Sequence, residues 1–395
     1  MKMSGEIIDN IIKLKELEKL PIFHMSLSSK ELFHSNFLGW ILENYQEEMV
    51  IFFESELRCK FTTREIKNIQ REKKNIDLSF TIGDTLFLIE NKVKSIAYKE
   101  QLDKYSQLDK KIFTNDDVVK IKYILLSLQE PEFINTNKEY QSPNGYIWRY
   151  IGYTNLVAGL RKIANFENEY HRHLIEDYIQ FIKILNENIM QQVPQANVLN
   201  MYQKGTPDYE FLQKLTEIRM HDFFQKAVFE NFANDICKEL IKQRGTYKEL
   251  KEIKSGMTRG TGLINIFFEY DSDVSMGIQI QGGQYRKFIN GTSEEDIFEL
   301  STKLKNKSFF AFQFFGGKEV RPSNPNKKLQ KLAENLGIAN VDCAFNKYHW
   351  PLKKQLFLYK YITPKEVLSN ADYINIICDD LKEMISLISE IKKDE

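Results

Sequence analysis

The chain has 395 residues, of which 42% are hydrophobic and 28% charged, and its Lys and Arg residues balance its Asp and Glu residues to a formal net charge of zero. This composition is typical of a soluble globular protein that is long enough for two domains with ordinary cores. It excludes a strongly basic chain with a global field for nucleic acid, and no apolar run approaches the length of a membrane span.

Cysteine usage and the N-terminal region predict a cytoplasmic protein. The cysteines, Cys59, Cys237, Cys343 and Cys378, lie far apart and form no Cys-x-x-Cys pair. This spacing favours reduced thiols and argues against a structural zinc. No N-terminal apolar stretch resembles a signal peptide, so we expect a cytoplasmic location and no membrane partner.

The first predicted elements are two helices and a strand. Residues 6–20 have apolar positions at helical spacing. Ser28 and Glu31 form a capping-box pattern that starts a second helix running to about Tyr45. Residues 61–71 alternate in the manner of a strand.

A basic run leads into the next element. Its members are Arg58, Lys60, Arg64, Lys67, Arg71, Lys73 and Lys74, with Glu65 and Glu72 among them. Such a run is more often a solvated strand face than a track for phosphates, and both interpretations stay open.

Residues 75–93 predict an antiparallel hairpin with Gly83 and Asp84 as its two-residue turn. Counting outward from that turn puts Asp77 directly opposite Glu90, and Lys92 then points to the same face, diagonal to Asp77. Cross-strand neighbours are roughly 5 Å apart, so the two carboxylates repel each other unless a hard cation such as Mg²⁺ lies between them. The sequence therefore predicts a metal site with a lysine beside it.

The alternative is a surface hairpin whose charges are solvated. Against it, residues 86–89 are apolar on both faces, as in a buried central strand. Charges at the end of a buried strand need a partner or a function.

Downstream, a helix is predicted over residues 98–111, and the apolar residues 121–128 predict a strand. The remaining elements up to residue 190 are a strand over 146–153 and helices over 154–164 and 167–190. Residues 191–208 read as a linker with Pro194, Gly205 and Pro207. The region 209–395 is predicted to be α+β, with a long helix over 209–243, strands over 263–270, 274–281, 284–289 and 309–315, a tight hairpin at Gly282 and Gly283, and helices over 326–336 and 364–391.

Three motifs together resemble the PD-(D/E)XK nuclease superfamily. Ile76-Asp77, a 12-residue gap and Glu90-Asn91-Lys92 are similar to its signature, with Ile76 where the name-giving proline would stand. The following helix carries a Gln-x-x-x-Tyr pair, Gln101 and Tyr105, seen in many members. The segment 31–42 looks like the first helix of a bacterial branch, and the resemblance covers roughly residues 28–190.

The resemblance implies a restriction-endonuclease-like α/β core, a mixed central sheet flanked by helices, over residues 1–190. Residues 191–208 would be the linker, and residues 209–395 an α+β domain for recognition, regulation or dimerisation. In such an enzyme Asp77 and Glu90 would bind one or two Mg²⁺ ions, with Mn²⁺ as a substitute and the backbone carbonyl of Asn91 as a further ligand. Lys92 would position or help deprotonate a water, or stabilise charge in the transition state.

The same resemblance puts the helix face of Gln101 and Tyr105 beside the site, since residues four apart share one face. Glu31 is the candidate for an extra metal ligand from the first helix, and Glu72 is its rival. Both assignments compete with plain structural roles, a helix surface for the first pair and a helix cap for Glu31.

The expected function is that of a Mg²⁺-dependent nuclease acting on nucleic acid, DNA rather than RNA, in bacterial restriction or anti-phage defence. The alternative is a catalytically silent nuclease-like module that binds nucleic acid or a protein partner. A homodimer and an activating ligand or protein remain open.

Overall fold

The computed structural model describes residues 13–26, 31–113, 118–243, 250–258, 260–269, 274–282, 311–317, 357–362 and 369–393. The chain divides into two compact units, one of residues 5–192 and 217–223, and one of residues 1–4, 193–216 and 224–395. Of the described helices, none combines the length and hydropathy needed to cross a bilayer.

Within the described residues of the first unit, six strands form one mixed sheet in the order β1-β2-β3-β4-β6-β5. The strands are β1 (Ile66–Lys73), β2 (Ile76–Ile82), β3 (Thr85–Lys92), β4 (Lys120–Ser127), β5 (Glu139–Gln141) and β6 (Ile147–Gly152). The order β1-β2-β3 is antiparallel, β3-β4-β6 is parallel, and β5 pairs antiparallel with β6 at the edge. This is the mixed α/β sheet that the sequence predicts.

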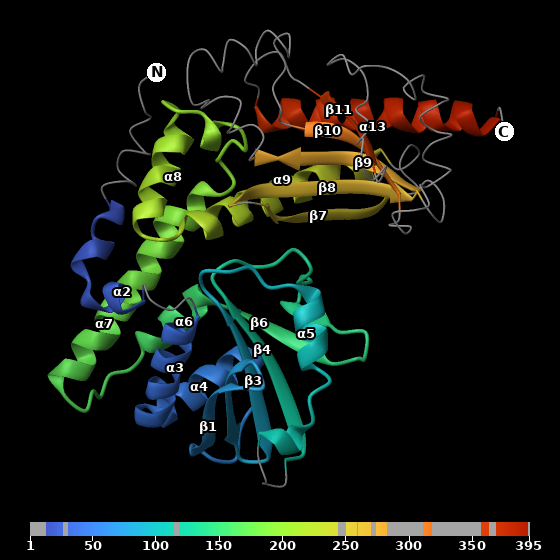
Figure 1. Ribbon diagram of the computed structural model, residues 1–395. Helices are drawn as coiled ribbons and strands as arrows, with labels where there is room; N and C mark the ends of the chain where they lie inside the picture. Colours follow the sequence, from blue (N-terminus) through green and yellow to red (C-terminus); the bar gives the residue numbers. More distant parts are fainter. Residues whose placement is uncertain are drawn as a thin grey trace, which may run out of the picture. The chain divides into compact units, whose positions relative to one another are not determined.

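Helices cover both faces of this sheet (Figure 1). They are α2 (Pro21–Ser26), α3 (Leu32–Asn44), α4 (Gln46–Leu57), α5 (Lys99–Tyr105), α6 (Tyr153–Leu160) and α7 (Glu169–Ile184). On the α4 face, Phe53 packs against Phe80 and Phe87 with ring centroids 5.3 Å apart in both pairs. On the α5 face, Leu102 is buried in a cluster with Trp148 and neighbouring strand residues.

Several boundaries in this unit differ from the prediction. The capping-box helix begins at Leu32, and Glu31 is its N-cap without a side-chain capping bond. Ser28 and the predicted helix up to residue 12 lie outside the described residues. The helix α4 was not predicted, and the helix expected over 98–111 ends at Tyr105. Residues 185–189 continue α7 as a π-helix.

The second unit combines helices with an antiparallel sheet in the order β11-β10-β9-β8-β7 over its described residues. Its strands are β7 (Leu250–Thr258), β8 (Thr261–Glu269), β9 (Val274–Gln281), β10 (Ala311–Gly317) and β11 (Phe357–Ile362). Its helices are α8 (Pro207–Glu217), α9 (His221–Lys242), whose first residues belong to the other unit, and α13 (Asn370–Lys393).

The long helix predicted over 209–243 is wrong, because the chain breaks between α8 and α9 at Arg219, whose φ is 56°. A left-handed residue interrupts the helical hydrogen bonds even where the apolar spacing continues. The strand β7 was not predicted. The predicted elements 284–289 and 326–336, and Gly283 of the predicted hairpin, lie outside the described residues.

The predicted linker, 191–208, contains a short 3-10 helix, Asn200–Tyr202. Val198, Met201 and Tyr202 are buried in the second unit. This part of the chain is therefore packed over much of its length.

Candidate active site

The predicted hairpin and its register are confirmed by the paired strands β2 and β3. Ile82 pairs with Thr85 across the turn, and the pairing continues outward to Leu78 opposite Ile89. Gly83 takes a φ of 57° in that turn, which suits a residue without a Cβ. The next position outward places Asp77 across from Glu90, at the end of β3 that also carries Lys92.

Glu90 is a buried carboxylate with one satisfied oxygen. Its side chain is 1% exposed, and Oε1 accepts hydrogen bonds from Lys92 Nζ at 2.6 Å and from Gln101 Nε2 at 2.7 Å. The other oxygen, Oε2, is buried without a hydrogen-bond partner. Burial raises the pKa of Glu90 to about 8, and the charge of Asp77 raises it further. An unpartnered buried carboxylate oxygen is costly, so this atom is a candidate position for a ligand.

Asp77 is the second carboxylate of the pair. Its Oδ2 accepts the backbone N–H of Asn91 at 2.6 Å. Burial raises the pKa of Asp77 to about 6, against the opposing effects of the Asn91 amide and Lys92. Burial alone would lower the pKa of the Lys92 ammonium, but the adjacent Glu90 carboxylate raises it overall. The site therefore holds one cation against two carboxyl groups that share a low-dielectric environment.

Helix α5 brings Gln101 and Tyr105 to the same place. Gln101 Nε2 donates to Glu90 Oε1 and also lies 3.0 Å from the Tyr105 hydroxyl. The two residues thus share one helix face, and that face borders the carboxylate pair. The amide fixes the Glu90 carboxylate from the α5 side, while Lys92 fixes it from its own strand.

Asn91 reaches the opposite face of the sheet, because successive side chains of a strand alternate. Its side chain is 1% exposed and is held at both ends. Asn91 Nδ2 donates to Ser35 Oγ of α3 at 3.1 Å, and Asn91 Oδ1 accepts from the Tyr153 hydroxyl of α6 at 2.5 Å. Since the backbone N–H of Asn91 binds Asp77, this clamp behind the sheet fixes the strand that carries the site.

The clamp extends into a buried polar chain. Tyr153 and Tyr178 are both buried and interact electrostatically, and the Tyr178 hydroxyl lies 3.0 Å from His34 Nδ1. Burial lowers the pKa of His34, so the imidazole is neutral. His34 Nδ1 donates to the Tyr178 hydroxyl when this nitrogen carries the ring proton. Ser35, Tyr153, Tyr178 and His34 were not predicted as site residues. The alternation of β3, which turns Asn91 away from Glu90 and Lys92, is the one signal in the sequence that pointed to a second face.

Glu31 and Glu72 lie near the site at its edge. Glu31 Oε1 accepts the backbone N–H of Lys94 at 3.3 Å rather than capping its helix. The charges of Glu31 and Glu72 both contribute to raising the pKa of Asp77. Among the described residues, however, no group of three or more His, Cys, Asp or Glu side chains is gathered closely enough to hold a metal ion. The acidic centre is therefore the pair Asp77 and Glu90, and the predicted ligand Glu31 is not drawn into a closed cluster with it.

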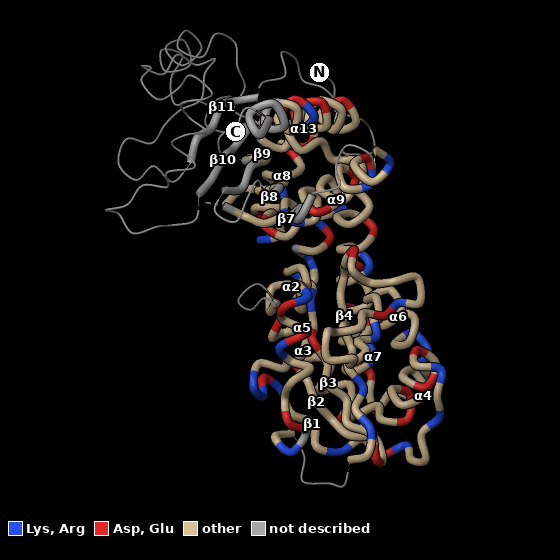
Figure 2. Tube along the Cα trace, turned by 90° about the vertical axis from the view of Figure 1, so that its right-hand side faces the viewer, with Lys and Arg blue, Asp and Glu red and all other residues tan. Residues whose placement is uncertain are grey.

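The basic run before the hairpin is largely paired with carboxylates. Lys60 and Arg64 bind Glu54 at 3.0 and 2.9 Å. The further pairs are Lys67 with Glu65 at 3.1 Å and Arg71 with Glu43 at 3.8 Å. Lys and Arg are interspersed with Asp and Glu along the described chain (Figure 2). These contacts favour a solvated, ion-paired strand face for this run.

Comparison with protein families gives a class for the first unit's sheet and the helices around it. Residues 21–197 match the family described as the PD-(D/E)XK nuclease superfamily. This part of the chain belongs to that superfamily, and its mixed six-stranded sheet is the corresponding fold. Comparison with curated proteins and with solved structures gives no significant match.

Proposed function

We propose that the protein is a metal-dependent nuclease that hydrolyses phosphodiester bonds in DNA at the Asp77 and Glu90 pair. The observation that carries the proposal is the buried Glu90 Oε2, which has no hydrogen-bond partner. Asp77 occupies the opposite position on the neighbouring strand β2. The membership of residues 21–197 in a nuclease superfamily supports the reaction class.

The residues present fit a hard divalent cation. Carboxylate and carbonyl oxygens are the ligands of Mg²⁺, and a cation between the two carboxylates would offset both their repulsion and the burial of Glu90. The Lys92 carbonyl accepts from Leu128 N on the β4 side. Carbonyls alternate along a strand, so the Asn91 carbonyl is directed to the β2 side, where Asp77 lies. Asp77, Glu90 and the Asn91 carbonyl are therefore the proposed ligands, with Glu31 as an outer candidate.

A bound cation would supply Lewis acidity toward the scissile phosphate and toward an attacking water. Lys92 has a strongly held positive charge 2.6 Å from Glu90, which suits the stabilisation of a negatively charged transition state. Gln101 holds the Glu90 carboxylate in one orientation and leaves Oε2 for the ligand. Tyr105 supports Gln101 through its hydroxyl, and this is a positioning role.

DNA as substrate, and bacterial restriction or anti-phage defence as context, are part of the proposal and are supported by the superfamily resemblance alone. The second unit, with its own sheet, is proposed to recognise a target, to bind a regulator or to mediate a homodimer. The rival function, a silent module that binds nucleic acid, shares the fold but makes no use of Lys92.

The test is cleavage of plasmid, linear duplex, single-stranded DNA and RNA in the presence of Mg²⁺ or Mn²⁺. The wild type is compared with Lys92→Met and with a control, Lys120→Met, which removes an exposed lysine at the other end of the parallel strands. Metal-dependent cleavage by the wild type and the control, but not by Lys92→Met, is the expected result. Equal cleavage by all three would refute the site, and metal binding without cleavage would favour the silent module.

A further inference from the structure

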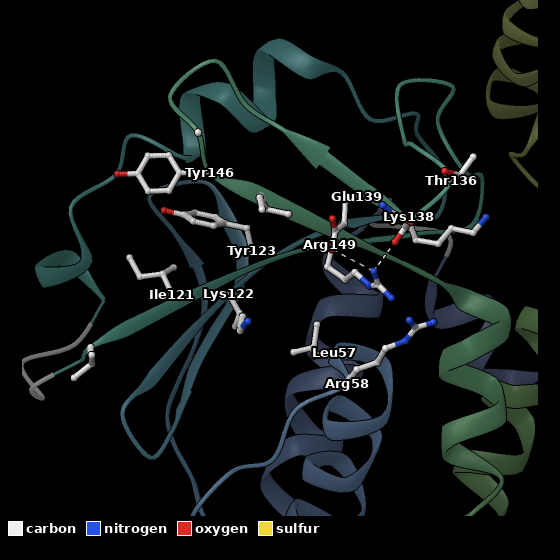
Figure 3. A pocket seen from close by; sticks show the side chains of 14 residues that line it. Leu57, Arg58, Ile121, Lys122, Tyr123, Thr136, Lys138, Glu139, Tyr146 and Arg149 are labelled. Carbon is white, nitrogen blue, oxygen red and sulfur yellow. Dashed lines mark hydrogen bonds and ion pairs between the residues drawn. The ribbon is translucent and has the colours of Figure 1, made fainter.

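A second feature of the nuclease-like unit is an open groove of about 980 Å³ at the start of β4 and β6 (Figure 3). Lys122, Ile147 and Arg149 line it on the strands, and Arg58 lines it from the end of α4. In the β3–β4 register Glu90 lies beside Leu125. Lys122 is three residues earlier, about 10 Å along the strand, and faces the opposite side of the sheet. The groove is thus separate from the carboxylate pair.

The groove is positively charged although the chain is neutral. Among the described residues that line it, four are cations and one is a carboxylate, namely Arg58, Lys122, Lys138 and Arg149 against Glu139. Arg149 lies 3.4 Å from Glu139, and Lys138 binds Glu130 at 2.6 Å. Within the described part of the chain, the side chains of Arg58 and Lys122 make no hydrogen bond or ion pair. Two cations therefore remain for an external anion.

The position of Arg58 has a steric cost. Arg58 is the C-cap of α4 with φ 50° and ψ 46°, a left-handed conformation that glycine adopts without penalty. An arginine there instead extends its guanidinium into the groove (Figure 3). Lys122 is close enough to the same turn to act on Cys59, where burial raises the pKa of the thiol and the Lys122 charge counteracts it. The turn after α4 and the start of β4 thus bring two like charges to one groove, an arrangement that an anion stabilises.

The other end of the groove is aromatic. Tyr146 is 42% exposed and packs edge-on against the buried Tyr123, with ring centroids 5.4 Å apart and an interplanar angle of 63°. Ile147 beside it is 52% exposed. An exposed ring that is braced from one side offers its free face to a base, and stacking of this kind needs a base that is not already stacked in a duplex.

We propose that this groove binds a single-stranded segment of nucleic acid, with phosphates on Arg58 and Lys122 and a base on Tyr146. Cations at one end and an exposed aromatic ring at the other match the repeating phosphate and base of a strand. An acidic peptide would use the cations but not the ring. The proposal rests on the proposed function only in taking nucleic acid as the polyanion, and it adds a contact at the start of β4 and β6, separate from the carboxylate pair.

The experiment measures binding of fluorescein-labelled oligo(dT) to the full chain by anisotropy, in EDTA, over a series of salt concentrations. Each phosphate contact to a single strand contributes about 0.7 to the slope of log K against log salt. Arg58→Gln with Lys122→Gln should therefore make this slope less steep by about 1.4. The matched control, Arg172→Gln with Lys183→Gln, removes the same charge from α7, which contributes nothing to the groove, and should leave the slope unchanged.

The aromatic end has its own test. Tyr146→Ala should weaken binding by about 5- to 150-fold, the range that corresponds to loss of one stacked base, without altering the salt slope. Tyr146→Phe keeps the ring and should restore binding. A loss in both variants would refute stacking, since it would assign the effect to the hydroxyl.

Competitors separate the sources of the ligand. Unlabelled oligo(dT) should compete, whereas thymidine monophosphate, duplex DNA and poly-glutamate should compete at least tenfold more weakly. Equal competition by any of the three would overturn the single-strand assignment. An unchanged slope in the double groove variant, or no binding by the wild type, would overturn the groove itself.

The proposed function is tested apart from the groove with bis(p-nitrophenyl) phosphate, a small phosphodiester that needs no distant contact. Unaltered hydrolysis by the double groove variant, with weaker oligo(dT) binding, is the expected result. Groove-dependent binding by a wild type that hydrolyses nothing would leave the groove standing and refute the nuclease. A loss of hydrolysis in the groove variant would contradict the separation of the two sites.

Discussion

The hydroxyl of Tyr153 gives the most direct test of the clamp behind the site. Tyr153→Phe removes a hydrogen bond of 2.5 Å to Asn91 Oδ1 and leaves the ring in place. Both residues are 1% exposed, so no solvent water replaces the lost donor. A buried acceptor left without its partner costs about 1–3 kcal/mol. We therefore expect the free energy of unfolding to fall by that amount in urea denaturation of the metal-free protein.

A matched substitution is available in the neighbouring strand. The Tyr150 hydroxyl lies 3.4 Å from the Ser127 carbonyl oxygen, a long contact in a partly exposed position. Tyr150→Phe should change the free energy of unfolding by less than about 0.5 kcal/mol. A double-mutant cycle of Tyr153→Phe with Asn91→Ala should give a coupling energy of about 1 kcal/mol or more. Equal effects of the two Tyr→Phe substitutions, or a coupling of zero, would refute the clamp.

The clamp also has a consequence for catalysis under the proposed function. Since the Asn91 N–H fixes Asp77 Oδ2 at 2.6 Å, a looser Asn91 misaligns a carboxylate of the reacting site. We expect Tyr153→Phe to lower kcat by about tenfold and to leave KM within about twofold, because no substrate contact is removed. A role in stability alone would lower the fraction of folded enzyme and leave kcat per folded molecule unchanged.

Three further predictions concern ionisation and backbone strain. Burial raises the pKa of Asp77 to about 6 and of Glu90 to about 8, so the contribution of these groups to stability is lost as the pH rises through this window. Because Mg²⁺ binds the deprotonated carboxylates, the rise in Tm caused by Mg²⁺ should grow from pH 6 to pH 8. A rise in Tm that does not depend on pH, or that Glu90→Gln retains, would contradict cation binding to this pair. The Phe61 N–H and the adjacent cations lower the pKa of Glu54 to about 2. The contribution of Glu54 to stability is therefore present above its unfolded pKa and lost as the pH falls toward 2. Glu54→Gln should flatten the acid limb of a curve of Tm against pH, and an unchanged limb would refute this role. Arg58→Gly should raise the free energy of unfolding by about 0.5–1 kcal/mol, because glycine relieves the strain of the left-handed conformation but adds backbone entropy to the unfolded chain. A lower free energy of unfolding in urea denaturation would contradict that balance.

The hairpin could be predicted because its determinants are local. Strand alternation has a period of two, and the two-residue turn at Gly83 and Asp84 leaves only one register that buries the apolar residues. That register placed Asp77, Glu90 and Lys92 together without any knowledge of the rest of the chain. The position of Gln101 beside the site could be predicted for the same reason, since the helix that carries it directly follows the hairpin strand.

The remainder of the site depends on contacts between distant segments. Asn91 is separated by 62 residues from Tyr153 and by 56 from Ser35, and no periodicity links such positions. The break at Arg219 was missed for a related reason. Apolar spacing continues through it, and only the tertiary structure stabilises a left-handed residue there. The capping-box assignment of Glu31 failed because a pattern of two residues does not decide which backbone amide a carboxylate will accept.

Strand β3 connects these observations, because its last three residues serve both layers of the unit. Glu90 and Lys92 face α5, where Gln101 binds the carboxylate, and Asn91 faces α3 and α6, where its amide is held at both ends. A shift of one residue in this strand would exchange the two sets and would bury Lys92 among the partners of Asn91. The clamp therefore fixes the register as well as the orientation of the site. Under the proposed function, the clamp also holds the two carboxyl groups close together, and a bound cation would offset the cost of that arrangement.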